Sequence, residues 1–335
     1  MTKPQPIPDP PSNSQRRRFR RKLLAWYDTH RRDLPWRENG DPYRVWLSEI
    51  MLQQTRVAAV IEHYHEFLRR FPSVQKLAAA REASVLAAWS GLGYYRRARM
   101  LHAAAKLIVR ERSGRIPSTE KGLRELPGMG RYTAAAIASI AFEEPVAVVD
   151  GNVERVLHRM LGKQLAGEAL WKAAGEFLDK SRPGDFNQAM MELGATVCTP
   201  RAPACLTCPV VGLCSTRGEL TATAPRAPQK KREIHYSLDF RNRDFSDGEV
   251  FLVQRQRDAS LMPGMWELPE TTNLNGKSSP SFKLRHSITV TNYAVRVWRI
   301  AASSSVAGKW IPVKRLNQIA LTGLARKVLR KAEML

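Results

Sequence analysis

Apolar residues recur at helical spacing through the first two thirds of the chain. Between residues 16 and 197 they are interspersed with Ala, Arg and Glu, and no alternating strand pattern of useful length occurs. The helical segments are separated by short breaks at Asp41-Pro42, Phe71-Pro72, Gly91-Leu92-Gly93, Ile116-Pro117 and Pro183-Gly184. The pattern predicts a mostly α-helical domain over residues 16–197.

The composition changes on either side of this domain. Residues 250–253 and 293–298 are rich in β-branched and aromatic residues, as strands are, and residues 314–333 have the pattern of a basic terminal helix. We therefore predict a small α+β domain at 234–335. Residues 217–233 have the composition of a linker, and the prolines of residues 1–15 predict a disordered tail.

The charge of the chain narrows the choice of partner. Its 335 residues suit about two domains, and 54 Lys and Arg stand against 31 Asp and Glu, for a net charge of +23. A surplus of this size favours a polyanion, most simply nucleic acid. The basic run from Arg16 to Lys22 is open to two interpretations, a solvated helix face or a contact with the DNA backbone.

Two absences in the sequence concern location. No stretch approaches the roughly 18 unbroken apolar residues of a membrane-spanning helix. No apolar segment typical of a secretory signal follows the N-terminal arginines. We therefore expect no membrane partner, and a location in the cytoplasm or another reducing compartment that contains DNA.

All the cysteines lie close together, between residues 198 and 214. A disulfide scaffold would spread them along the chain, so the cluster indicates metal ligation. The spacing suits either a structural Zn²⁺ or a [4Fe-4S] cluster, and chemistry alone does not choose between them. The four candidate ligands are Cys198, Cys205, Cys208 and Cys214.

A glycine-rich segment at 126–130 separates two predicted helices. Ser118 or Thr119 can cap the first helix, and the second begins near Arg131. Gly128 and Gly130 permit positive φ and a close approach of backbone N–H groups to an anion, such as a DNA phosphate. The alternative is a plain helix–helix turn.

Glu49 lies in a helix that we expect to begin at Asp41-Pro42, an N-cap followed by a proline suited to the first helical position. Val45, Trp46 and Leu52 flank it on one face. A carboxyl on that face is removed from water, which raises its pKa and suits it to act as a general acid. The alternative is a structural Glu paired with a buried Arg.

Asp150 lies where the apolar segment Val148-Val149 enters a helix. The simplest role there is an N-cap. In the same position the helix dipole favours the ionised carboxylate. A protonated and an ionised carboxyl form the pair that cleavage of a glycosidic bond needs, because the acid activates the leaving group and the anion stabilises an oxocarbenium ion.

Taken in order, these motifs resemble those of the helix-hairpin-helix DNA glycosylases, and in particular the MutY-type adenine glycosylases. The resemblance covers residues 18–216 densely. The segments that carry it are Leu34-Pro35-Trp36-Arg37, residues 46–55, Gly91-Leu92-Gly93-Tyr94-Tyr95, Asp150-Gly151-Asn152-Val153 and Phe186-Asn187-Gln188-Ala189-Met190.

The resemblance implies a fold and an activity. The fold is a mostly α helix-hairpin-helix glycosylase core with an iron–sulfur loop at 198–216, plus a small α+β Nudix-like C-terminal domain. The activity is removal of adenine mispaired with 8-oxoguanine or guanine in double-stranded DNA. The cofactor implied by the cysteine spacing is a [4Fe-4S] cluster, and we expect a monomer.

It also implies roles by position. Glu49 matches the acid that protonates adenine N7, and Asp150 matches the carboxylate that stabilises the sugar cation, with Tyr132 and Asn152 as supports. The residues that match the adenine pocket are Trp36, Arg37 and Glu192. The residues that match the wedge at the lesion are Gln54 and Tyr94. Those that match the phosphate-binding hairpin are Gly128 and Gly130.

One position separates this family from endonuclease III-like glycosylase/lyases, which carry a Lys after the hairpin Gly-Arg pair. Here Tyr132 follows Gly130-Arg131, so no amine stands there to form a Schiff base. We therefore predict a monofunctional glycosylase. An endonuclease III-like enzyme and a non-catalytic DNA-binding protein are the two alternatives.

The last third of the chain resembles the family's MutT-like domain at residues 251–255 and 264–269. The Glu-rich metal box of Nudix hydrolases is absent from the sequence, so we expect no pyrophosphatase activity. Family members usually carry Phe-Ser-His in the loop that reads 8-oxoguanine. Aligned on His286, this chain carries Ile288-Thr289-Val290 instead.

Overall fold

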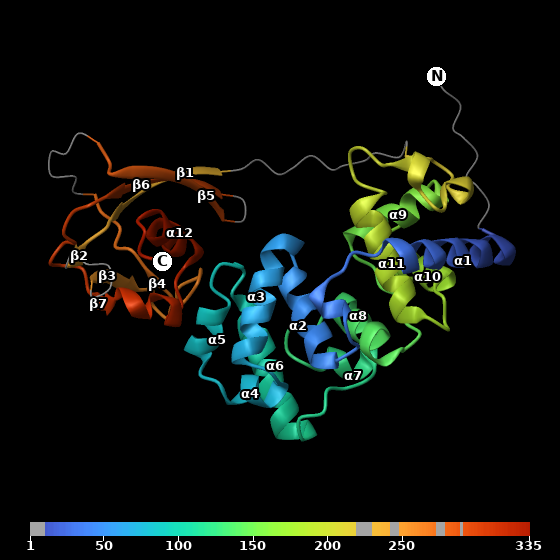
Figure 1. Ribbon diagram of the computed structural model, residues 1–335, viewed down its shortest axis with the longest axis horizontal. Coiled ribbons are helices and arrows are strands. Elements are labelled where there is room, and N and C mark those ends of the chain that lie inside the picture. Colours follow the sequence, from blue (N-terminus) through green and yellow to red (C-terminus); the bar gives the residue numbers. More distant parts are fainter. Residues whose placement is uncertain (1–10, 219–229, 242–247, 273–278, 289–290) are drawn as a thin grey trace. The chain divides into compact units, whose positions relative to one another are not determined.

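The computed structural model describes residues 11–218, 230–241, 248–272, 279–288 and 291–335 (Figure 1). The chain divides into two compact units. The first contains Met1–Gln54 and Leu107–Ala224, and the second contains Thr55–Lys106 and Pro225–Leu335. This division differs from the predicted domain bounds, because residues 55–106 join the strands of the C-terminal region.

The first unit is helical. Its elements are α1 (Asn13–His30), η1 (Pro35–Arg37), α2 (Pro42–Leu52), α7 (Glu120–Arg124), α8 (Arg131–Phe142), α9 (Gly151–Leu161), α10 (Gly167–Phe177), α11 (Pro183–Thr196), η2 (Cys205–Thr207) and η3 (Val211–Leu213). α6 (Arg96–Arg112) crosses the boundary between the units. Most of residues 1–15 lie outside the described part, but α1 begins at Asn13 because Ser12 and Gln15 form a capping box.

The predicted helix starts are confirmed in this unit. Asp41 Oδ1 accepts a hydrogen bond of 2.8 Å from the Arg44 backbone N–H, and Pro42 is the first residue of α2. Thr119 caps α7 in the same way, and α8 begins at Arg131 after the glycine hairpin. These are local effects, in which a side chain satisfies an N–H group that the first helical turn leaves without a partner.

One hydrophobic core joins α1, α9, α10 and α11. The rings of Phe19 and Phe177 meet edge to face at 5.0 Å, and Phe186 packs on Phe19 from the other side. Three of the four cysteines, Cys198, Cys208 and Cys214, pack against this core. The cysteine loop is therefore mounted on the same apolar cluster that positions α9.

The basic run in α1 divides into two sets. Arg20 donates hydrogen bonds of 2.8 Å to the carbonyls of Glu176 and Phe177 at the end of α10, and Arg16 pairs with Glu176. The remaining basic side chains of the run are exposed on one helix face, namely Arg17, Arg18, Arg21 and Lys22. The exposed set fits either interpretation of the basic run, whereas Arg16 and Arg20 contact α10.

The second unit combines helices and strands. Its helices are α3 (Val57–Arg70), α4 (Val74–Ala79), α5 (Glu82–Ala88), η4 (Val313–Gln318) and α12 (Gly323–Lys331), together with most of α6. Its strands are β1 (Lys230–Ser237), β2 (Phe240–Arg241), β3 (Glu249–Gln254), β4 (Trp266–Glu267), β5 (Phe282–Ile288), β6 (Thr291–Trp298) and β7 (Lys309–Pro312). The predicted strands at 250–253 and 293–298 are confirmed in β3 and β6.

The strands form two sheets. β1, β6 and β5 form one, in which β1 and β6 are parallel and β5 is antiparallel. β3 pairs with β2, β4 and β7 in the other. The buried residues of α12 pack with those of both sheets in one core. β1 begins at Lys230, inside the predicted linker, because Lys230 pairs with Thr291 of β6; residues 219–229 lie outside the described part.

The predicted terminal helix at 314–333 is wrong in its middle. It is divided into η4 and α12, since the backbone at Leu321 bridges to Trp266 and Thr322 then starts a new helix as its N-cap. In the part of the chain that the structure describes, none of the helices has the length and apolarity needed to cross a bilayer.

Candidate active site

Glu49 lies on the buried face of α2. The residue is 6% exposed, and its helix neighbours Val45 and Trp46 are buried as well. The Tyr132 hydroxyl, from the second residue of α8, donates a hydrogen bond of 2.8 Å to Glu49 Oε2. Because α2 packs on α8, the Tyr132 hydroxyl lies beside the Glu49 carboxyl, whose neighbours on α2 are apolar.

The environment of Glu49 favours its protonated form. Burial raises the pKa of Glu49 from 4.5 to about 7, and the charge of Asp150 acts in the same direction. The Tyr132 hydrogen bond and the positive charge of Arg37 act the other way and are outweighed. Near neutral pH the carboxyl therefore retains its proton in a large fraction of molecules, as a general acid must.

Asp150 is the N-cap of α9, as predicted. Its Oδ1 accepts hydrogen bonds from the backbone N–H groups of Asn152 at 2.9 Å and Val153 at 2.8 Å. Its Oδ2 accepts a third, of 2.8 Å, from Asn152 Nδ2. Such donors, at the positive end of a helix dipole, stabilise a negatively charged carboxylate. The same geometry thus serves both as a cap and as a fixed anion.

Asn152 is itself held from two directions. Arg155 Nη2 donates to Asn152 Oδ1 at 2.8 Å, and Arg155 Nε donates to the Cys198 carbonyl at 2.8 Å. On another side, a Cβ at Gly194 of α11 would lie 2.5 Å from Asn152 Cβ. Arg155 and Gly194 were not singled out from the sequence, because the contacts of Arg155 with Cys198 and of Gly194 with Asn152 each span about 40 residues.

Glu192 is a buried carboxylate that is paired with two arginines. Its side chain is 1% exposed and forms ion pairs with Arg32 at 2.6 Å and Arg37 at 2.9 Å. Burial works to raise the pKa of Glu192, but the hydrogen bonds and charges of Arg32 and Arg37 outweigh it and the net pKa is lowered. The Arg-paired alternative that we considered for Glu49 therefore describes Glu192 instead.

Trp36 and Arg37 lie in η1, just before α2. Trp36 is buried, and Arg37 reaches Gln188 Oε1 at 3.1 Å as well as Glu192. Because the charge of Arg37 also lowers the pKa of Glu49, this guanidinium lies near both carboxyls. Of the predicted pocket residues, Arg37 and Glu192 are therefore joined by an ion pair, and Arg37 acts through its charge on Glu49.

The glycine hairpin, residues 126–130, is the turn between α7 and α8. Gly128 has a φ of +79°, which favours glycine, whereas Gly130 has an ordinary φ of −75° and is the N-cap of α8. Both are exposed, and a Cβ at Gly130 would meet no atom within 4 Å. The start of α8 is thus open to an anion.

Gln54 and Tyr94 share an unusual backbone. Their φ values are +55° and +47°, in the left-handed region that side chains other than glycine seldom adopt. Both side chains are exposed, Tyr94 to 46%. Residues held this way cluster at functional positions. Gln54 belongs to the first unit and Tyr94 to the second.

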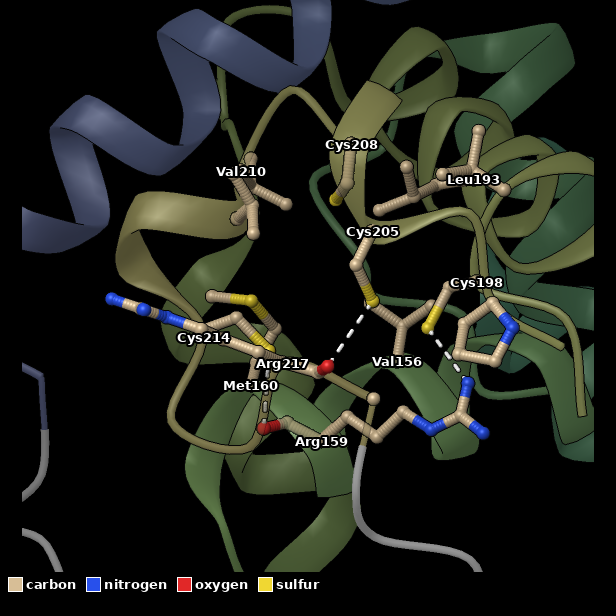
Figure 2. Close-up of a pocket in the computed structure, with 14 residues that line it drawn as sticks. Val156, Arg159, Met160, Leu193, Cys198, Cys205, Cys208, Val210, Cys214 and Arg217 are labelled. Carbon is tan, nitrogen blue, oxygen red and sulfur yellow. Dashed lines mark hydrogen bonds between the residues drawn. The ribbon is translucent and has the colours of Figure 1, made fainter.

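The four cysteines line one pocket, and none is in a disulfide (Figure 2). Cys198 follows α11, Cys205 begins η2, and Cys208 and Cys214 follow η2 and η3. Arg159, which is 2% exposed, donates a hydrogen bond of 3.3 Å to Cys198 Sγ.

The environment of these thiols suits a bound cation centre. Burial, with the neighbouring thiols, raises the pKa of Cys208 to about 11. Thiolates at this site therefore need a positive centre among them. Across the described residues, no three His, Cys, Asp or Glu side chains are grouped around a position for a single metal ion. The four thiols nevertheless line one pocket, and four cysteines in one loop are a donor set for a metal cluster.

Sequence comparison places these residues among DNA repair proteins. Residues 47–170 match the family described as "HhH-GPD superfamily base excision DNA repair protein". The chain is 40% identical over 311 residues to the adenine DNA glycosylase of Mus musculus, a match that covers 76% of this chain and 60% of that protein. It is 42% identical over 214 residues to the adenine DNA glycosylase of Mycobacterium tuberculosis, covering 62% of this chain and 70% of that protein.

A solved structure shows the same fold over part of the chain. The "structure of a thermostable thymine-DNA glycosylase" superposes with a TM-score of 0.59 and 31% identity, over 62% of this chain and 99% of that one. For the mouse, rat, human and Arabidopsis thaliana relatives, the chain spans only 39% to 60% of their length.

The raised pKa of Glu49 predicts a stability that depends on pH. Between about pH 4.5 and 7 the unfolded chain loses the Glu49 proton while the folded protein keeps it, so the free energy of unfolding falls by about 3 kcal/mol across this window. Glu49→Gln removes that loss and still accepts from Tyr132. We expect it to be more stable than the parent at pH 8 and equally stable near pH 4.5, measured by urea unfolding.

Glu192→Gln is the matched control, because it makes the same change at a carboxyl whose pKa is lowered. That carboxylate contributes stability above its ordinary pKa and loses it as the pH falls, so the variant should be less stable than the parent at pH 8. A Glu49→Gln protein that is destabilised at pH 8, as Glu192→Gln is, would contradict the account of Glu49.

Proposed function

The chain belongs to the adenine DNA glycosylase family, and we propose that it is a base-excision-repair enzyme that hydrolyses the bond between adenine and deoxyribose in double-stranded DNA. The proposed substrate is adenine mispaired with 8-oxoguanine or guanine. The observation that carries the proposal is the pairing of Glu49, whose pKa is raised to about 7, with Asp150, whose carboxylate accepts three hydrogen bonds at the start of α9.

In this mechanism Glu49 is the general acid. It donates its proton to N7 of an adenine that has been turned out of the duplex, because the glycosidic bond cannot be attacked within the stacked helix. The bond then breaks with its electron pair going to the base. The Tyr132 hydroxyl fixes the direction of the carboxyl during this step.

Asp150 stabilises the sugar cation that remains. Its carboxylate is held by Asn152 and by backbone donors, so its charge is in place before the cation forms and needs no reorganisation. Water then adds its oxygen to C1′, and the proton that water loses restores the acid. The products are free adenine and an abasic site.

The adenine pocket is proposed to be formed by Trp36, Arg37 and Glu192. Glu192 is satisfied by two guanidinium groups, so its oxygens act as fixed acceptors rather than as acids. Arg37 lies near both Glu192 and Glu49, which suits a residue that orients the base toward the acid.

DNA binding is proposed to use the hairpin and the two left-handed residues. Gly128 and Gly130 leave backbone N–H groups accessible to a phosphate. Gln54 and Tyr94, exposed and held at positive φ, are proposed to fill the space that the extruded adenine leaves in the stack. The net charge of +23 supports binding to the duplex backbone.

The enzyme is proposed to be monofunctional. Tyr132 occupies the position at which endonuclease III-like enzymes carry a Lys, and its hydroxyl is engaged by Glu49. A non-catalytic DNA-binding protein, the other alternative, would have no use for a buried acid that is costly to ionise.

We further propose that residues 234–335 form a Nudix-like domain that reads the base opposite adenine. The mixed sheet of β1, β6 and β5 packed with α12 supports this. Of the segment Ile288-Thr289-Val290, Ile288 is the last residue of β5, and Thr289 and Val290 lie outside the described residues. Action as a monomer and a location in the cytoplasm or another reducing compartment that contains DNA stay predictions.

Cys198, Cys205, Cys208 and Cys214 are proposed to hold a [4Fe-4S] cluster, with one iron for each cysteine. When bound, the cluster supplies positive charge and cross-links to a loop with few apolar residues of its own. Arg159 then offsets thiolate charge at Cys198, and Arg155 links the same loop to Asn152.

The proposed role of Glu49 predicts a simple kinetic test on a duplex with one adenine opposite 8-oxoguanine. Glu49→Gln should abolish adenine release in single turnover while DNA binding is retained. In the parent, the rate should fall as the pH rises through about 7, because the acid form is lost. Full activity in the variant would refute the role, and an enzyme–DNA adduct trapped by borohydride would favour the endonuclease III-like alternative.

A second prediction concerns Gly194, which packs on Asn152. In Gly194→Ala the new methyl would lie about 3.0 Å from the Asn152 backbone as well as against its side chain, so α9 or α11 must shift. We expect adenine release to slow by about tenfold or more, because a small misplacement of Asp150 is costly. Gly175→Ala in α10 is the control, since a Cβ there meets no atom within 4 Å; equal rates in the two variants would contradict the account.

A third prediction concerns the cysteines. The purified protein should contain about four irons per chain and absorb broadly in the visible range. Cys208→Ser should lose the iron and the absorption, whereas Thr207→Ala, its neighbour in the same loop, should keep both. Equimolar zinc without iron would overturn the cluster assignment.

A further inference from the structure

The turn that carries Tyr94 is conformationally strained. Gly91, Gly93 and Tyr94 all have positive φ, of +112°, +69° and +47°. For a tyrosine this conformation costs roughly 1 kcal/mol or more and persists only where the surroundings impose it. We call residues 90–95 the Tyr94 turn. What holds this turn therefore decides where the exposed Tyr94 ring stands.

Part of the constraint comes from the neighbouring helices. Trp89 Nε1 donates to the Gly93 carbonyl at 3.2 Å, and Arg97 Nη2 donates to the carbonyls of Leu92 and Gly93 at 3.2 Å each. The Arg97 guanidinium also lies 5.5 Å from the centre of the Tyr94 ring. These contacts fix the middle of the turn but not its ends.

The two ends of the turn are held by one carbonyl of the C-terminal domain. Leu321 O accepts hydrogen bonds from Ser90 Oγ at 2.9 Å and from Tyr95 Oη at 3.1 Å. Arg326 Nε, from α12, donates to Ser90 Oγ at 3.1 Å. Ser90, Tyr95 and Leu321 are 2%, 3% and 0% exposed, so water does not compete for these bonds. We call these three hydrogen bonds the latch.

The acceptor of the latch is itself rigid. The residues on either side of Leu321 form backbone hydrogen bonds with Trp266. The backbone N–H of Trp266 donates to the Ala320 carbonyl at 2.8 Å, and the Thr322 backbone N–H donates to the Trp266 carbonyl at 2.9 Å. Thr322 then caps α12. Leu321 is thus held between β4 and α12, two elements of the domain that we propose reads the opposing base.

We propose that the C-terminal domain positions the wedge residue Tyr94 through the latch, with Ser90 and Tyr95 as positioning residues. This inference rests on the proposed function, in which Tyr94 enters the stack at the lesion. The domain proposed to contact the base opposite adenine thereby also fixes the position of Tyr94, the residue inserted beside that base. Tyr94 and this domain belong to the same compact unit.

The test compares two serines that are equally buried and chemically alike. Ser90→Ala removes one donor of the latch, whereas Ser237→Ala, also 2% exposed and donating to the Pro269 carbonyl at 3.4 Å, lies in β1 outside it. Ser90→Ala should slow single-turnover adenine release about tenfold, because it removes two of the three hydrogen bonds of the latch, the one to Leu321 O and the one from Arg326 Nε. Ser237→Ala should stay within about twofold of the parent.

A double-mutant cycle separates positioning from general destabilisation. If the latch acts through Tyr94, adding Ser90→Ala to Tyr94→Ala causes no further loss. Losses that multiply would overturn the proposal. Arg326→Lys, which keeps the charge but lacks the Nε donor, repeats the test with a half-buried side chain in case Ser90→Ala folds poorly.

Two readouts do not depend on catalysis. Amide hydrogen exchange over residues 90–95 in the free protein should be faster in Ser90→Ala than in Ser237→Ala, and equal exchange would overturn the latch. Fluorescence of 2-aminopurine next to the 8-oxoguanine should rise less on binding Ser90→Ala than on binding the parent. A parent that releases no adenine would defeat the proposed function while leaving the exchange result to decide the latch.

Discussion

The proposed chemistry depends on keeping one carboxyl neutral beside another that accepts three hydrogen bonds at a helix N-terminus. Glu49 has a single hydrogen-bond donor and little contact with water, and Asp150 has three donors at a helix N-terminus. The two side chains interact electrostatically, since the charge of Asp150 helps to raise the pKa of Glu49. The charge of Asp150 therefore adds to burial in favouring the protonated form of Glu49.

Glu192 shows that burial does not decide the role of an acid by itself. It is at least as buried as Glu49, but two guanidinium groups lower its pKa, whereas burial without an ion pair raises that of Glu49. Arg37 contacts Glu192 and is close enough to act on Glu49 through its charge. Arg37 thus stabilises the Glu192 carboxylate together with Arg32, but only partly opposes the protonation of Glu49.

Much of the site could be predicted from the sequence because its features are local. Asp41 and Asp150 cap helices, the glycines form a turn, and apolar neighbours bury Glu49; each of these effects spans about four residues or fewer. The break at Leu321 could not be predicted, because a bridge to Trp266 interrupts a helical pattern that is otherwise continuous.

The supporting residues escaped prediction for the same reason. Gly194 is required by Asn152 across 42 positions, and Ser90 meets Leu321 across 231. Neither distance leaves a periodic signal in the sequence, and a serine or a glycine carries no chemistry that would single it out. Local patterns predicted the candidate pair Glu49 and Asp150. They missed the long-range contacts that hold the surrounding elements in place.

These contacts explain how a costly acid is retained. A carboxyl with a pKa near 7 destabilises the folded state above that pH. Such a loss of stability is a recurrent cost of sites that serve activity. At Asp150 the supporting contacts extend through Asn152 and Arg155 to the Cys198 carbonyl. The cysteine loop packs against the same core as α9 through Cys198, Cys208 and Cys214. The position of the Asp150 carboxylate is therefore linked, through Asn152 and Arg155, to the loop that carries the cysteines.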